Sequence, residues 1–183
     1  MKIQKTELEG CLIIDPTVYE DHRGVFFEGF NASVFSKLSG YDFEVKQLNC
    51  SQSAKGVIRG LHFQKPPFEQ AKLVFVTRGK VMDVIVDLRP GSATYGKHIK
   101  VILSAENQKR VFIPRGFAHG FMALEDHTDL NYLVDGLYNK DYDSGIIYSD
   151  ETLAIDWSYE GIDEIILSEK DNNLQNLKQY NGE

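Results

Sequence analysis

The sequence predicts an all-β fold, a β-sandwich or jelly roll with short peripheral helices, formed by one domain over residues 1–183. Two observations favour this class. Short apolar-alternating runs separated by turn signals follow one another from residue 11 to residue 135. Helix signals are few, so the pattern is not that of alternating βαβ units. A chain of this length with 42% hydrophobic residues fits one domain with a sizeable core.

The strands are placed by their β-branched and aromatic residues and by the turns between them. The clearest pair covers residues 72–77 and 81–88, whose glycine-bearing connection predicts a β-hairpin. Further turns are indicated by the Gly- and Pro-containing stretches 89–92 and 113–116. The other predicted strands cover residues 11–14, 25–30, 43–51, 57–63, 99–103, 110–113, 116–123 and 129–134.

Two short helices are expected outside the strands. Asn31 is a suitable N-cap for a helix that ends near Gly40. A weak amphipathic pattern that includes Leu174 and Leu177 predicts a second helix over residues 171–180.

Charge and cysteine content narrow the possible partners. With 20 basic and 27 acidic residues the net charge is −7, which argues against nucleic acid but not against a small anion held by a local basic cluster.

The sequence shows neither a membrane-length apolar run nor a signal peptide. Cys11 and Cys50 lack a CxxC spacing, so reduced thiols in the cytoplasm are expected. No dinucleotide-binding glycine motif is present, and no cofactor is expected.

Ionisable groups inside apolar strands are the more informative feature, because a buried unpaired charge is costly and is usually paired or functional. His62 is such a group, in the segment 56–64. In a regular strand Arg59 points to the opposite face, unless Gly60 forms a bulge that re-aims one of the two. Taken alone, His62 is more simply a core histidine bonded to a carbonyl.

Three further polar residues interrupt apolar strands. Lys72 opens the most hydrophobic strand, where its ammonium either reaches solvent or sits in a cleft and donates to a developing oxyanion. His119 shares a face with Phe117 and Phe121, and structural burial is the simpler interpretation. Tyr132 is flanked by leucines and is taken first as a core tyrosine.

Two charged groups have purely local interpretations. Asp171 follows Ser168 by three residues, which resembles a capping box. Arg23 and Glu28 flank apolar residues and can pair with each other across a sheet.

Metal binding is not favoured. Residues 62–64 read His-Phe-Gln, with a glutamine where a His-x-His metal motif has its second histidine. A two-histidine site that adds His119 and a carboxylate has no supporting spacing. The sequence therefore predicts no metal.

Seven stretches, in order and at consistent spacing, carry a resemblance over almost the whole chain. They are 21–28 (DHRGVFFE), 47–51 (QLNCS), 56–64 (GVIRGLHFQ), 70–74 (QAKLV), 81–89 (VMDVIVDLR), 113–121 (IPRGFAHGF) and 167–171 (LSEKD). Together they resemble the cupin-type dTDP-4-dehydrorhamnose 3,5-epimerase family, and the ordered set is far more specific than any one of them.

The resemblance implies a cupin jelly roll that epimerises C3 and/or C5 of a nucleotide-linked 4-keto sugar, for surface polysaccharide biosynthesis. It implies that His62 is the base, Asp171 the carboxylate that orients it, Tyr132 the proton donor and Lys72 the residue at the reacting ketone. It also implies a homodimer whose sites are shared, residues 23–28 coming from the neighbouring subunit. The implied substrate-binding residues are Arg23, Phe26, Glu28, Gln47, Asn49, Arg59, His119, Tyr138, Asp143 and Lys170.

Some positions depart from the family pattern. Asp143 stands where a substrate-binding Glu is common, residues 147–150 (IYSD) replace a usual Trp-Asn-Asp, and Leu48 occupies a position that is often polar. These departures concern substrate recognition, so both a dTDP-linked hexose and a GDP-linked hexose or heptose remain open. A 3,4-ketoisomerase and a non-catalytic cupin that binds a sugar nucleotide are the alternatives from other classes.

Overall fold

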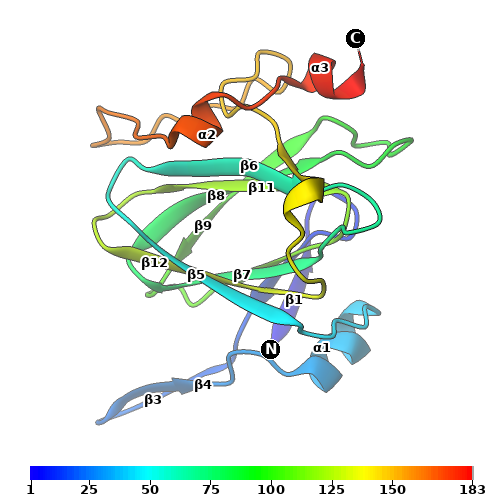
Figure 1. The fold of residues 1–183 in the computed structure, drawn as a ribbon. Helices are drawn as coiled ribbons and strands as arrows, with labels where there is room; N and C mark the ends of the chain where they lie inside the picture. Colours follow the sequence, from blue (N-terminus) through cyan, green and yellow to red (C-terminus); the bar gives the residue numbers. More distant parts are fainter. Residues whose placement is uncertain (183) are drawn as a thin grey trace.

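The computed structural model describes residues 1–182, and its strands form two facing sheets and a separate hairpin (Figure 1). The order in the six-stranded sheet is β1-β2-β10-β7-β12-β5, and that in the five-stranded sheet is β13-β6-β11-β8-β9. Among the described residues, β3 and β4 pair with each other alone. Neighbouring strands run antiparallel, and the predicted all-β class is confirmed.

The bounds of the elements are as follows. The six-stranded sheet contains β1 (Lys2–Lys5), β2 (Leu12–Asp15), β5 (Gln47–Ser53), β7 (Lys72–Arg78), β10 (Arg110–Ile113) and β12 (Thr128–Val134). The five-stranded sheet contains β6 (Ile58–Gln64), β8 (Lys80–Asp87), β9 (His98–Ser104), β11 (Phe117–Ala123) and β13 (Asp143–Gly145). The hairpin is β3 (Val18–Asp21) and β4 (Gly24–Phe27), and the helices are α1 (Ala32–Ser39), η1 (Lys140–Tyr142), α2 (Glu169–Asn172) and α3 (Leu177–Asn181).

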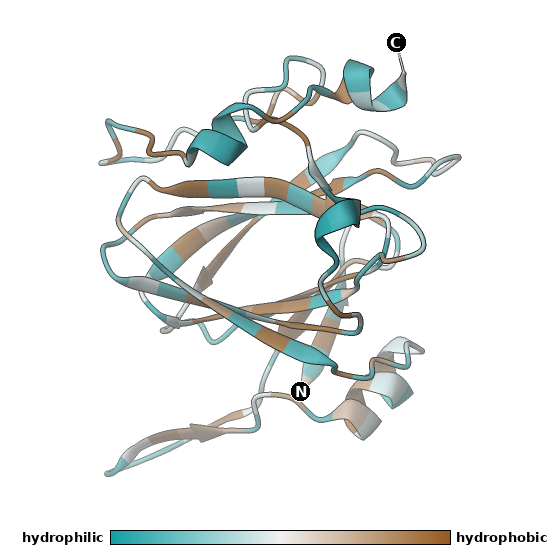
Figure 2. Cartoon of the chain, in the orientation of Figure 1, coloured by the Kyte–Doolittle hydropathy of each residue, from teal (hydrophilic) through white to brown (hydrophobic). Residues whose placement is uncertain are grey.

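Buried apolar side chains fall into three clusters, because both faces of each sheet are covered. Val74, Ile85 and Phe121 belong to the cluster between the sheets. A second cluster joins α1 to the outer face of the six-stranded sheet, and a third joins residues 146–182 to the outer face of the five-stranded sheet. The C-terminal residues and α1 accordingly lie on opposite sides of the barrel in Figure 1. Brown and teal alternate along several barrel strands in Figure 2, as expected when successive side chains point to opposite faces.

The helix predicted after Asn31 is confirmed with its caps. The Asn31 side chain accepts a hydrogen bond from the Val34 N–H at 3.0 Å. Gly40 has φ +78°, the left-handed conformation that ends a helix, and its N–H donates to the Ser36 carbonyl at 2.9 Å.

The β-hairpin predicted from residues 72–77 and 81–88 is wrong, because β7 pairs with β10 and β12 in the six-stranded sheet, whereas β8 pairs with β9 and β11 in the other sheet. Several predicted boundaries are wrong as well. The strand predicted over 25–30 is β4, which ends at Phe27, and the one predicted over 43–51 is β5, which runs from Gln47 to Ser53. The helix predicted over 171–180 is two short helices, because Asn176 starts α3 with a reciprocal capping box to Gln179. The strands β1, β3 and β13 were not predicted from the sequence; each has only three or four residues.

Within residues 1–182, no helix combines the length and the hydropathy needed to cross a bilayer.

Candidate active site

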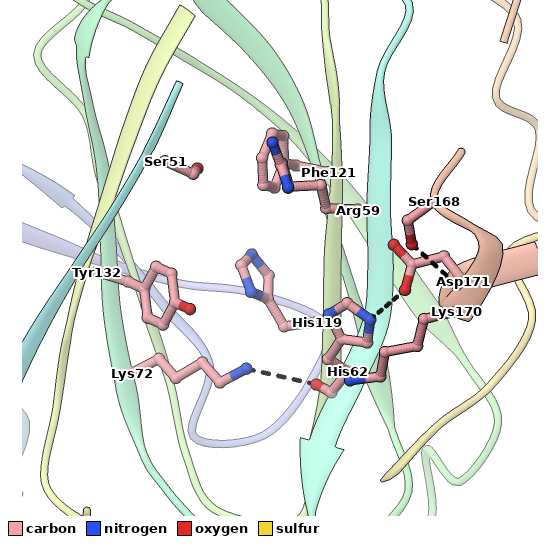
Figure 3. Close-up of a pocket in the computed structure, with 10 residues that line it drawn as sticks. All are labelled: Ser51, Arg59, His62, Lys72, His119, Phe121, Tyr132, Ser168, Lys170 and Asp171. Atoms are coloured by element: carbon pink, nitrogen blue, oxygen red, sulfur yellow. Dashed lines mark hydrogen bonds and ion pairs between the residues drawn. The ribbon is translucent and has the colours of Figure 1, made fainter. Parts of the chain in front are cut away.

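An open pocket of about 310 Å³ lies between the two sheets (Figure 3). One wall comes from β5, β7 and β12, and the other from β6 and β11, with α2 at its edge. The pocket is lined by Ser51, Arg59, His62, Lys72, His119, Phe121, Tyr132, Ser168, Lys170 and Asp171. The structure thus brings together seven of the residues that the resemblance implies.

A bulge in β6 is what directs two of these side chains into the same pocket. His62 pairs with His119 and Arg59 pairs with Phe121, so β6 carries one more residue than β11 between the two pairs. Gly60 provides the irregularity, with φ +130° and a position where a Cβ would lie 2.5 Å from the Gly120 Cα. The expected bulge at Gly60 is confirmed, whereas the expectation that Arg59 faces away from His62 is wrong.

His62 forms a pair with a carboxylate from the other end of the chain. Its Nε2 lies 2.6 Å from the Asp171 Oδ1. Burial raises the pKa of Asp171, but the hydrogen bond with His62, and the charge of that ring when it is protonated, lower the pKa by more, so the pKa of the carboxyl lies below its usual value. An ionised carboxylate only accepts, so Nε2 carries the hydrogen, and Nδ1 has the free lone pair when the ring is neutral. Figure 3 shows the second ring nitrogen on the side of the ring away from Asp171.

The local interpretation of Asp171 is only half correct. Ser168 does cap α2, accepting from the Asp171 backbone N–H at 3.0 Å. The Asp171 side chain, however, is directed at His62 and is 3% exposed. The cap therefore fixes the backbone from which the carboxylate reaches the histidine.

Tyr132 and Lys72 stand on the opposite wall from His62. Tyr132 lies on β12 and Lys72 on the neighbouring β7, with the Lys72 Nζ 5.8 Å from the centre of the Tyr132 ring. The same Nζ lies 3.4 Å from the His62 carbonyl oxygen. Lys72 is 8% exposed, so the interpretation of a strand-end lysine in solvent is wrong. Burial lowers the pKa of Lys72 to about 8, and burial raises the pKa of Tyr132.

A second histidine–carboxylate pair contributes only its histidine, His119, to the lining of the pocket. His119 Nε2 lies 2.7 Å from Asp83 Oδ1, and both side chains are buried. Burial lowers the pKa of His119, and the charge and hydrogen bond of Asp83 offset this only in part. Asp83 Oδ2 has no hydrogen-bond partner within residues 1–182. Asp83 was not among the site residues predicted from the sequence. The feature that could have indicated it is a carboxylate among the apolar residues of the strand 81–88.

The mouth of the pocket is lined by a polar network from three segments. Asp143 Oδ2 accepts from the Lys170 Nζ at 2.5 Å and from the Tyr138 hydroxyl at 3.1 Å. Gln47 Oε1 accepts from the Tyr138 N–H at 3.2 Å, and its Nε2 donates to Asn49 Oδ1 at 2.7 Å. These five residues line a hollow that also touches His62, Lys72 and Tyr132.

Arg23, Phe26 and Glu28 lie outside the pocket of their own chain. Arg23 is bound to Asp21, with Nη2 2.6 Å from Oδ2, and Glu28 accepts from Asn31 at 3.1 Å, so the expected Arg23–Glu28 pair is wrong. Phe26 is 71% exposed on the hairpin.

In the described part of the chain, no three His, Cys, Asp or Glu side chains are grouped so that they can hold a metal ion.

A pocket between two β-sheets with an oriented histidine on one wall, and a half-buried tyrosine and a buried lysine on the other, offers proton donors and acceptors to both faces of a bound molecule. The sequence pattern of the dTDP-4-dehydrorhamnose 3,5-epimerase family matches residues 5–179, and the chain belongs to this family.

Individual proteins and crystal structures similar to this chain also carry the name of a 3,5-epimerase. The dTDP-4-dehydrorhamnose 3,5-epimerase of Methanothermobacter thermautotrophicus is 49% identical, over 96% of this chain and 94% of that protein. The crystal structure of the enzyme of that name from Elizabethkingia anophelis is 46% identical, with a TM-score of 0.93 over 99% of this chain and 98% of that one. The structure of the 3,5-epimerase RmlC from Legionella pneumophila in complex with dTDP-4-keto-L-rhamnose is 42% identical, with a TM-score of 0.92 over 97% and 93% of the two chains.

Proposed function

We propose that this protein epimerises C3 and C5 of a dTDP-linked 4-keto-6-deoxyhexose, a step in making a sugar for a surface polysaccharide. One observation carries the proposal: His62, oriented by Asp171, and Tyr132 line opposite walls of one pocket, and the Lys72 ammonium lies near both of them. The family and its named members support the dTDP-linked substrate over a GDP-linked one.

The proposed chemistry uses the acidity of a carbon beside a ketone. His62 removes the proton through Nδ1, and Asp171 stabilises the imidazolium that forms. Lys72 donates to the enolate oxygen, where one such donor is worth roughly 3–4 kcal/mol. Tyr132 then protonates the opposite face, which inverts the centre. The 4-ketone acidifies both C3 and C5, so the same groups serve both centres once the sugar ring is repositioned.

The charged residues around the pocket support an anionic ligand despite the net charge of −7. Arg59 and Lys170 both line the pocket, and Arg59 is held by its Nε, which donates to Ser53 Oγ at 3.1 Å. Asp143 already neutralises Lys170, so we propose that a diphosphate competes with Asp143 for this ammonium.

The function is tested by incubating the protein with dTDP- and GDP-linked 4-keto sugars in D2O. We expect deuterium at C3 and C5 of the dTDP-linked sugar with inverted configuration, as located by NMR. A keto group moved to C3 would identify a ketoisomerase instead. Binding without exchange would identify a non-catalytic cupin.

Activity is expected to fall at alkaline pH because of Lys72. Its pKa is lowered to about 8 by burial, so the ammonium is present below this pH and is lost above it. We expect kcat/KM to fall about tenfold per pH unit above about pH 8. In Lys72→Met the remaining activity lacks this dependence. A wild-type profile that is flat to about pH 10 would contradict the role of Lys72.

The reaction is expected to need no metal, because Lys72 supplies the positive charge at the enolate oxygen. Exhaustive chelation should leave the rate unchanged. A large loss that one divalent ion restores would overturn this expectation.

We further propose a two-fold homodimer in which residues 23–28 complete the site of the other subunit. Arg23, Phe26 and Glu28 do not reach the pocket of their own chain, and the hairpin that carries Arg23 and Phe26 exposes apolar side chains.

Mixing two inactive variants tests this sharing. In a mixed dimer of His62→Ala and Arg23→Ala chains, one site has both defects and the other has none. Random mixing of equal amounts is therefore expected to restore about a quarter of wild-type activity. His62→Ala mixed with Lys72→Met is the control, because each mixed site then keeps one defect. Equal behaviour of the two mixtures, or an active monomer in light scattering, would exclude a shared site.

We propose that the protein works in the cytoplasm. Cys11 and Cys50 are both free thiols, the state expected in a reducing compartment.

A further inference from the structure

The β3–β4 hairpin, called here the arm (residues 18–27), projects away from the barrel (Figure 1). Its strands add to neither of the two larger sheets, and Tyr19 and Phe26 are 63% and 71% exposed. A two-stranded ribbon alone is marginally stable in water, so its direction depends on whatever holds its base.

Arg110 lies at that base, on the outer face of the six-stranded sheet. It stands directly opposite Phe75 in the β10–β7 register, and it is 5% exposed. The guanidinium carbon is 5.3 Å from the centre of the Phe75 ring and 5.2 Å from that of Phe27, the last residue of the arm. Arg110 is thus in contact with an aromatic ring of the sheet and with one of the arm.

Apart from the two aromatic rings, few described groups near Arg110 can stabilise its positive charge. Its one side-chain hydrogen bond within residues 1–182 runs from Nη1 to the Gln108 carbonyl oxygen, at 2.5 Å, and no described carboxylate forms a salt bridge with it. Burial lowers the pKa of Arg110, yet an arginine remains charged in a protein. A buried cation without a counter-ion is costly unless aromatic faces or other dipoles stabilise it. The two phenylalanine rings supply that stabilisation.

The backbone just after the arm also lies close to the Arg110 guanidinium. A Cβ added at Gly29 would lie 3.4 Å from the Arg110 Nη2, so the backbone runs close to the guanidinium there. The arm is therefore held at its base from Phe27 to Gly29.

We infer that Arg110 is a positioning residue that fixes the base of the arm on the sheet and so sets where Arg23, Phe26 and Glu28 lie in the site of the second subunit. The inference rests on the shared site of the proposed function. Arg110 is distant in sequence from those three residues and lies outside the pocket, so it acts on binding rather than on proton transfer.

The test compares Arg110→Met, which keeps a long apolar side chain, with Arg110→Lys, which keeps the charge. For Arg110→Met we expect KM to rise about tenfold with kcat at saturating substrate unchanged, the size expected for loss of a desolvated cation–π contact. We also expect faster hydrogen–deuterium exchange of the amides in residues 18–27, while β7 and β8 exchange as in the wild type. Arg110→Lys should recover part of both effects. Arg78→Met is the matched control, since Arg78 is exposed and pairs with Asp129 at 3.5 Å.

Unchanged KM and unchanged arm exchange in a folded Arg110→Met protein would overturn the inference. A fall in kcat at constant KM would overturn it as well, because Arg110 would then act on the chemistry. If Arg110→Met fails to fold, Arg110→Lys decides, since it must still loosen the arm more than Arg78→Met does. A wild-type protein without epimerase activity would refute the proposed function, whereas the exchange of the arm would still decide whether Arg110 holds it.

Discussion

The His62→Ala variant is expected to lose both solvent exchange and epimerisation, because no enolate forms without the base. Asp171 then faces a cavity instead of an imidazole, and the other histidine of the pocket, His119, is bonded to Asp83 rather than to Asp171. General acid–base groups contribute about 10²–10⁴-fold, so the loss should reach this range at C3 and at C5 alike. Deuterium incorporation and product stereochemistry are read from the same NMR spectra.

His98→Ala is the matched control for this variant, since His98 begins β9 and does not line the pocket. Its rate should equal that of the wild type. Normal exchange in His62→Ala would show that the proposed mechanism is wrong at its first step.

The Tyr132→Phe variant is expected to fail differently, because it loses only the hydroxyl that returns a proton to the other face. His62 can still form the enolate and reprotonate it from its own side. The variant should therefore wash deuterium into C3 and C5 with retained configuration, while inversion falls about 10²–10⁴-fold. Burial raises the pKa of Tyr132, which keeps the phenol protonated and able to donate near neutral pH.

Tyr138→Phe separates the two candidate acids. Tyr138 donates its hydroxyl to Asp143 at the mouth of the pocket and is 54% exposed, so its loss should affect substrate binding more than inversion. Inversion at a near-normal rate in Tyr132→Phe would exclude Tyr132 as the acid and make Tyr138 the next candidate.

The strands of the barrel were predictable because their signal is strong and local. The strands β7 and β8 follow from two β-branched runs on either side of a glycine turn, although the chain passes at this turn from one sheet to the other and does not form the predicted hairpin. The helix α1 follows from Asn31 and Gly40. The arm strand β3 was missed because all four of its residues are exposed, so no buried face imposes an alternating pattern. The split between α2 and α3 had a usable signal, the capping box of Asn176 and Gln179, which the weaker leucine periodicity obscured.

The residues that line the pocket were predictable only in part, and their geometry was not predictable. Residue types and the resemblance indicate His62, Tyr132, Lys72 and Asp171. The hydrogen bond of 2.6 Å between His62 and Asp171 could not be predicted from local sequence, because the two residues lie far apart along the chain. Arg59 faces the pocket because β6 has an extra residue at Gly60. A prediction that assumes strict alternation of faces along the strand therefore places Arg59 on the wrong face. Asp83 was missed because a single buried carboxylate has no local partner in sequence.

The position of Asp171 links the proposed chemistry to the order in which the chain is made. Every strand of the two sheets precedes residue 146, whereas Asp171 belongs to the layer that covers the outer face of β6 through Trp157, Leu153 and Leu177. During synthesis the barrel strands, including the strand of His62, therefore leave the ribosome before Asp171 does. On the proposed mechanism the base becomes competent only when this late layer has docked, so local opening of residues 146–182 is expected to stop proton transfer.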